Sequence, residues 1–95
     1  MTRTTYLKPV VIESVPELLE ADTLYVSFEY STCIHLCACG CGLQTVTPIG
    51  SGEWSLLVDE NTGSEEGQLI TLWPSILNRS CGSHYFVQKN KVVWT

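Results

Sequence analysis

The chain has 95 residues, 44% of them hydrophobic, and a formal net charge of −5. This length predicts one domain with a modest core, spanning residues 1–95. An acidic chain without a basic run is a poor candidate for binding nucleic acid. The sequence also lacks an apolar run of about 18 residues that would cross a membrane and a secretory signal at its start, so we expect a cytoplasmic protein.

The first third of the chain predicts a strand followed by a short helix. Residues 10–14 are a short β-rich run. Residues 15–20 predict a single helical turn that begins near Pro16 and directs Leu18 and Leu19 inward.

Further extended segments follow before the middle of the chain. In residues 24–30 apolar and polar side chains alternate, which is the period-two pattern of a half-buried strand. The side chains expected on its buried face are Leu24, Val26, Phe28 and Tyr30. Residues 34–38 could continue this strand, and residues 44–48 are another extended piece.

The second half of the chain predicts two antiparallel hairpins, each made of two strand-like segments around polar turn residues. These segments are residues 54–58 and 69–73 with a tip at 59–67, then residues 84–88 and 92–95 with a turn at Lys89 and Asn90. Each tryptophan lies on a strand, so we expect Trp54, Trp73 and Trp94 to pack in the core. The expected fold is mainly β, a small antiparallel β-sheet domain with one short helix near the N-terminus.

The cysteines point to a metal site. Four of the five cysteines fall within residues 33–41, and without an export signal such spacing favours metal ligation over disulfides. Cys37 and Cys39 share one side of an extended chain, and the glycine before Cys41 lets that residue turn toward them. Cys81 would close the site. A zinc ion bound by Cys37, Cys39, Cys41 and Cys81 at a Gly/Cys-rich loop is the expected arrangement.

Alternatives to this ligand set stay open. His84 follows Cys81 by three residues and is a reasonable imidazole ligand in place of one cysteine. Another metal, an iron–sulfur cluster or buried free thiols are the other readings. Cys33 is expected to be a buried structural cysteine, and a redox or metal-sensing role would require it to be exposed and reactive.

With these residues the chain resembles the bacterial DUF6527 family over nearly its whole length. The segment from His35 to Gly42 and the segment from Cys81 to Tyr85 carry the resemblance together. Shorter matches include Val15-Pro16-Glu17, Val46-Thr47-Pro48, Pro74-Ser75-Ile76 and Val93-Trp94. Trp73 and Cys33 stand where smaller residues are usual in similar sequences.

The resemblance implies a role in bacterial operons that encode a ubiquitin-like protein with E1-like and E2-like enzymes, which are the expected partners. Under the first hypothesis the chain is a zinc-stabilised peptidase that processes or removes the ubiquitin-like protein. The alternative is a non-catalytic zinc-binding adaptor of the same conjugation pathway.

The candidate catalytic residues are serines and histidines near the cysteines. A serine becomes a nucleophile when a base takes its proton, and histidine is the usual base. Ser83 and His35 could approach one another beside the metal if their segments are neighbours. His84 is a second candidate base and Ser75 a second candidate nucleophile. Alternatively, Ser83 hydrogen-bonds a metal-bound thiolate and His35 is a buried core histidine.

Overall fold

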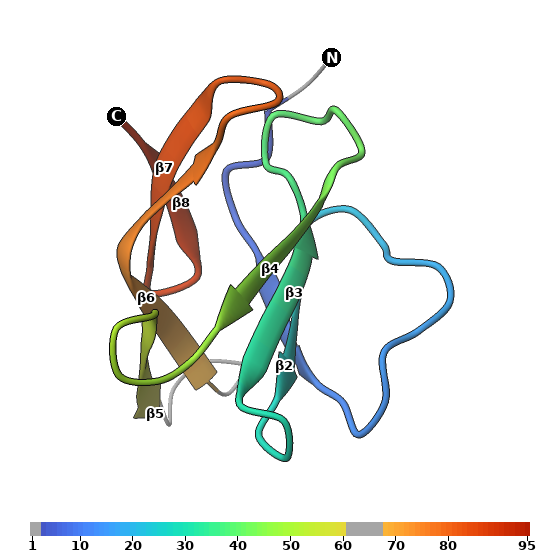
Figure 1. The fold of residues 1–95 in the computed structure, drawn as a ribbon, viewed down its shortest axis with the longest axis vertical. Helices are drawn as coiled ribbons and strands as arrows, with labels where there is room; N and C mark the ends of the chain where they lie inside the picture. The colour runs from blue at the N-terminus through green and yellow to red at the C-terminus, as the bar shows by residue number, and fades with distance from the viewer. Residues whose placement is uncertain (1–2, 61–67) are drawn as a thin grey trace.

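Eight strands form two four-stranded sheets in the computed structural model of the chain, which describes residues 3–60 and 68–95 (Figure 1). The first sheet has the order β1 (Lys8–Val11), β2 (Thr23–Ser27), β3 (Thr32–Leu36), β4 (Gln44–Pro48). The second has the order β5 (Ser55–Glu60), β6 (Gln68–Asn78), β7 (Ser83–Gln88), β8 (Lys91–Trp94). The fold is therefore mainly β, as expected.

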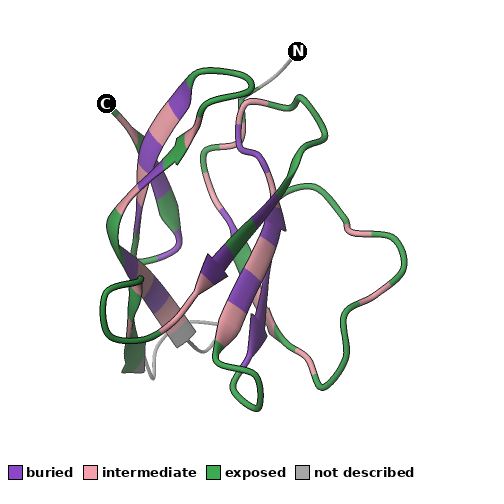
Figure 2. Cartoon of the chain, viewed as in Figure 1, coloured by how far each residue is buried: buried purple, intermediate pink, exposed green. Residues whose placement is uncertain are grey.

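The core lies between the sheets because alternate side chains of their strands are apolar. Along β3 and β7 buried residues alternate with half-buried ones, as Figure 2 shows. The buried cluster draws Leu24 and Val26 from the first sheet and Leu72 and Val87 from the second. Burying each such side chain stabilises the fold by roughly 1.5–3 kcal/mol.

The N-terminal segment ties the two sheets together. The backbone N–H of Val92 on β8 donates to the carbonyl of Thr5 at 3.0 Å, and the N–H of Leu7 donates to the carbonyl of Asn90 at 2.7 Å. The same segment continues into β1, which pairs with β2 of the other sheet. The chain thus holds β8 and β1 close to one another.

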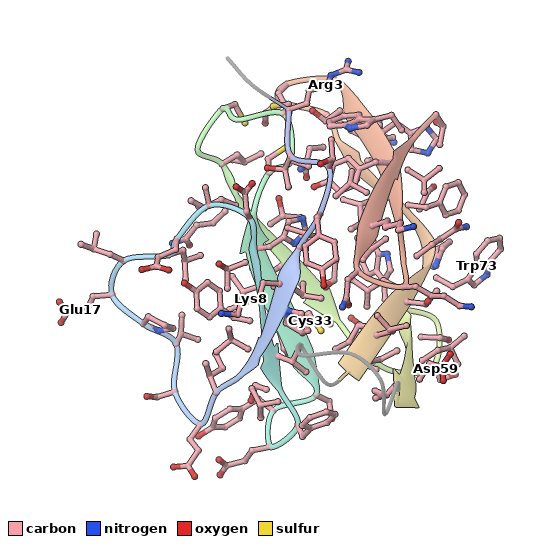
Figure 3. The ribbon with its side chains drawn as sticks, turned by 180° about the vertical axis from the view of Figure 1, so that it is seen from behind. Arg3, Lys8, Glu17, Cys33, Asp59 and Trp73 are labelled. Carbon is pink, nitrogen blue, oxygen red and sulfur yellow. The ribbon has the colours of Figure 1, made fainter. Side chains whose placement is uncertain are left out.

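The expected helix over residues 15–20 is wrong. Residues 3–60 and 68–95 contain no helix, and therefore none able to cross a membrane. The segment 12–22 is instead an irregular loop between β1 and β2, with Leu18 87% exposed. A single turn makes too few hydrogen bonds to offset its nucleation, and Leu18 finds no apolar surface to cover. In Figure 3 the labelled Glu17 lies far out on this loop.

The first sheet differs from the expectation in three further ways. β1 pairs with β2 in parallel, across the loop 12–22. The strand expected over residues 24–30 stops at Ser27, where a turn leads into the separate antiparallel strand β3, and Phe28 is 52% exposed in that turn. Every residue of β2 is buried rather than alternate ones. The loop helps cover its second face, since the N–H of Glu20 donates to the hydroxyl of Tyr25 at 2.8 Å.

Both hairpins of the second half form as expected, with β5 paired to β6 and β7 paired to β8. Residues 61–67 of the expected tip lie outside the described part. Trp54 and Trp94 pack against the core, which confirms two of the three tryptophan predictions. The prediction that Trp73 packs in the core is wrong: its side chain is 58% exposed because its neighbour Leu72 takes the inward position.

Candidate functional site

Two turns at the ends of strands bring the cysteines together. Between β3 and β4, the N–H of Cys37 donates to the carbonyl of Leu43 at 2.8 Å and closes the loop that carries Cys39 and Cys41. Within this loop Gly40 has a φ of 89°, a backbone conformation that strongly favours glycine. Between β6 and β7, Cys81 lies in the turn from Asn78 to Ser83.

The four predicted ligands form one cluster. The sulfur atoms of Cys37, Cys39, Cys41 and Cys81 all lie within 4.8 Å of one another, and Cys37 Sγ is 3.6 Å from both Cys39 Sγ and Cys81 Sγ. A tetrahedral ion with metal–sulfur bonds of about 2.3 Å separates its ligands by about 3.8 Å. The cluster therefore fits a single metal ion, and His84 is not part of it.

The thiols of the cluster differ in their pKa values. Burial raises the pKa of Cys37, but hydrogen bonds from the Cys39 backbone and from the Ser83 and Asn78 side chains outweigh it and lower that pKa to about 6. The Leu43 backbone lowers the pKa of the exposed Cys41, but the Cys39 thiol, local desolvation and the Cys81 thiol raise it to about 11. Neighbouring thiolates repel one another, so a bound cation is what allows all four to ionise together.

Ser83 and His35 lie at different places around this cluster. Ser83 is buried with its Oγ 3.1 Å from Cys81 Sγ. His35 is fully buried, with Nε2 2.7 Å from the Tyr85 hydroxyl, and burial lowers its pKa to about 4. Within the described residues no hydrogen bond joins His35 to Ser83. Ser83 thus stands beside the cysteine cluster, and His35 packs as a neutral histidine in the core.

Ser75, His84 and Thr95 form a second group on the other face of the second sheet. Ser75 Oγ lies 2.8 Å from His84 Nε2, and Thr95 Oγ1 lies 2.7 Å from His84 Nδ1. With the ring proton on Nδ1, the Ser75 hydroxyl donates to Nε2 and Nδ1–H donates to Thr95. Both ring nitrogens are thereby occupied, and the imidazole is held between two hydroxyl groups.

An irregularity in β6 places Ser75 beside His84. The pairing of β6 with β7 shifts between Leu72 and Ile76, so extra residues are accommodated there. The indole N–H of Trp54 donates to the Pro74 carbonyl at 3.0 Å and fixes the segment before Ser75. The residue before Ser75 is thus bound to Trp54, and Ser75 itself meets His84.

Thr95 was not predicted from the sequence, although a signal was present. A turn at Lys89 and Asn90 pairs residues whose numbers sum to 179, as in Tyr85 with Trp94. Continuing that register puts Thr95 opposite His84, and the Thr95 N–H indeed donates to the His84 carbonyl at 3.1 Å.

Comparison with known protein families gives a match over most of the chain. A family model described as the bacterial ubiquitination-like system serine protease (BubE) matches residues 11–95. Searches of curated proteins and of solved structures give no match. The matched residues include the four clustered cysteines as well as Ser75, His84 and Thr95. The match agrees with the resemblance at the level of the bacterial ubiquitination-like system.

Proposed function

We propose that this chain, which belongs to the BubE family of serine proteases of bacterial ubiquitination-like systems, is a zinc-stabilised peptidase that processes or removes a ubiquitin-like protein. One observation carries the assignment of roles. Ser75 Oγ lies 2.8 Å from His84 Nε2, and His84 Nδ1 lies 2.7 Å from Thr95 Oγ1. This is the order of nucleophile, base and orienting group that serine peptidases use on unrelated folds.

The proton moves along this line. As Ser75 Oγ attacks the scissile carbonyl carbon, its proton passes to His84 Nε2. When the C–N bond breaks, His84 returns that proton to the leaving amine and leaves an acyl group on Ser75. A water molecule then releases the acid by the same two transfers. Thr95 accepts the hydrogen bond from Nδ1–H throughout and keeps Nε2 free to receive the proton.

The cysteine cluster has a separate task in this proposal. Zinc is the proposed ion because four thiolates are a usual ligand set for structural zinc. Bound there, it supplies a cross-link between the loop of Cys37 and the turn of Cys81. That turn leads directly into β7, the strand from which His84 projects. The cross-link would therefore order the strand that carries the base.

The open position of the pair suits a protein substrate. Ser75 and His84 are half-buried on the outer face of the second sheet, and neither lines the cavities of about 530, 380 and 70 Å³. A peptide segment presented by a folded protein can reach the pair on this face of the sheet. The ubiquitin-like protein, with E1-like and E2-like enzymes of a cytoplasmic pathway, is the proposed set of partners.

A cleavage assay tests the proposal. Metal-loaded protein is mixed with the ubiquitin-like precursor of its own operon, beside the variants Ser75→Ala, His84→Ala, Ser83→Ala and His35→Ala. Metal content is measured for each. We expect wild type to cleave and the Ser75→Ala variant to lose at least about 10³-fold in rate while keeping its metal.

Two outcomes would change the assignment. Loss of cleavage in metal-loaded Ser83→Ala, with full activity in Ser75→Ala, would move the nucleophile to Ser83. No cleavage by folded, metal-loaded wild type would favour the non-catalytic adaptor.

A further inference from the structure

Exposed apolar side chains lie on the same face of the second sheet as Ser75 and His84. Trp73 is 58% exposed and stacks on Phe86, with ring centroids 5.6 Å apart and planes inclined by 21°. Val93 on β8 pairs with Phe86 and is 41% exposed. The labelled Trp73 projects away from the body of the molecule in Figure 3. We call Trp73, Phe86 and Val93 the apolar strip.

A cationic cavity adjoins this strip. It has a volume of about 380 Å³ and is lined by Thr71, Gln88, Lys89, Lys91 and Val93. The N–H of Lys89 donates to the Thr71 hydroxyl at 3.0 Å, which holds the β7–β8 turn against β6. No carboxylate is among its lining residues. We call it the lysine cavity.

The register of β7 sets how far the lysine cavity lies from the proposed base. Alternate residues of a strand face the same side, so His84, Phe86 and Gln88 follow one another on the open face. At about 3.3 Å per residue, Gln88 stands about 13 Å along the strand from His84. An extended peptide covers that distance with about four residues. The catalytic pair, the apolar strip and the lysine cavity therefore form one continuous track.

The charge distribution of the chain indicates which kind of partner binds along this track. The chain carries a net charge of −5, yet it has no acidic residue after position 67 and keeps Arg79, Lys89 and Lys91 there. An acidic partner is repelled by the chain as a whole and is attracted to the lysine cavity. Apolar contact beside two cations fits a partner with an apolar segment next to a carboxylate.

Resting on the proposed peptidase function, we infer that the apolar strip and the lysine cavity dock the ubiquitin-like substrate. The docked segment is apolar and carries an acidic side chain about four residues from the scissile bond. The apolar strip contributes affinity by excluding water from the segment. The lysine cavity selects the carboxylate and sets the register that brings the scissile bond to Ser75.

Binding measurements test this docking surface directly. The catalytically disabled Ser75→Ala protein is titrated with fluorescently labelled ubiquitin-like precursor of its own operon. Lys89→Glu and Lys91→Glu are introduced singly, and Lys8→Glu on β1 is the control with the same change of charge. We expect each cavity variant to raise Kd about tenfold at low salt and Lys8→Glu to stay within about twofold. The Trp73→Ala variant should raise Kd at every salt concentration.

The measurements separate this inference from the peptidase proposal. Equal affinities for Lys91→Glu and Lys8→Glu, with wild type active in cleavage, would overturn the docking surface and leave the peptidase standing. Loss of affinity in the cavity variants, with no cleavage by wild type, would retain the surface and remove the catalytic role. Self-association that is lost in Lys91→Glu, without binding of the precursor, would assign the face to a second copy of the chain and overturn the inference. Thermal unfolding of every variant checks that the fold is intact.

Discussion

The cysteine cluster and the serine–histidine pair meet at two consecutive residues of one strand. Ser83 turns inward and lies 3.1 Å from Cys81 Sγ, while His84 turns to the open face and meets Ser75. Successive side chains of a strand point to opposite sides, so β7 places the cysteine cluster and the Ser75–His84 pair on opposite faces of one strand. The two sites are carried by the same strand but share no side chain, so each should respond to its own substitutions.

The largest expected effects are those of substitutions at these two neighbouring residues. We expect His84→Ala to lower kcat by about 10³-fold or more and to leave metal content unchanged. Ser83→Ala should weaken metal affinity by about 10–100-fold, because a hydroxyl that supports the thiolates is lost, and should leave kcat of the metal-loaded protein near wild type. Competition with a chelator and cleavage rates measure the two effects. A joint loss of both properties in either variant would contradict the separation.

The next effect concerns the cluster alone. Cys81→Ser removes the ligand that joins the two turns, and we expect the metal to be lost and Tm to fall by about 10 °C or more. Elemental analysis and thermal unfolding measure the two quantities. The matched control is Cys33→Ser, which lies outside the cluster and should retain the metal. A Cys81→Ser protein that binds metal as tightly as wild type would place the fourth ligand elsewhere.

A smaller effect is expected at the orienting residue. Thr95→Val keeps the shape of the side chain but removes the acceptor for His84 Nδ1–H, so the imidazole can adopt the unproductive tautomer or turn away. We expect kcat to fall about tenfold with little change in KM, and Thr95→Ser to restore it. Steady-state kinetics with both variants provide the check. Equal loss in the valine and serine variants would indicate that Thr95 acts through packing.

The smallest effect is expected at the remaining cysteine. Cys33 is fully buried, and that burial raises its thiol pKa to about 11 despite a hydrogen bond from Thr47. Since the thiol stays protonated below that pH, only about 10⁻³ of it is ionised at pH 8. In metal-stripped but folded protein, iodoacetamide should label the clustered cysteines and spare Cys33, as read by mass spectrometry. Rapid labelling of Cys33 would instead support a redox or metal-sensing role for this residue.

The cysteine loop was predictable because its chemistry is local. The three candidate ligands Cys37, Cys39 and Cys41 lie on alternate residues, and Gly40 before the third permits the turn, so this part of the site could be predicted without knowledge of the fold. The hairpin turn at Lys89 and Asn90 was equally local, and it contained the register that pairs His84 with Thr95. The burial of Cys33 was also predicted, because a free cysteine usually behaves as a small buried apolar residue.

The helix over residues 15–20 shows where local patterns fail. Its residues permit a helical turn, but a turn this short depends on apolar surface supplied by other parts of the chain. In the fold that surface is absent at Leu18, which is 87% exposed. Trp73 fails for the related reason that a neighbouring side chain, Leu72, takes the inward position.

By itself the sequence determined a mainly β chain with a clustered set of thiols, because strand alternation and ligand spacing are properties of short segments. Only the tertiary structure decided which serine meets which histidine. The shift in β6 pairing and the Trp54 bond to Pro74 bring Ser75 to His84, while the turn before Ser83 delivers Cys81 to the other cysteines. Such choices depend on register between strands, which contacts between distant segments set and no single segment encodes.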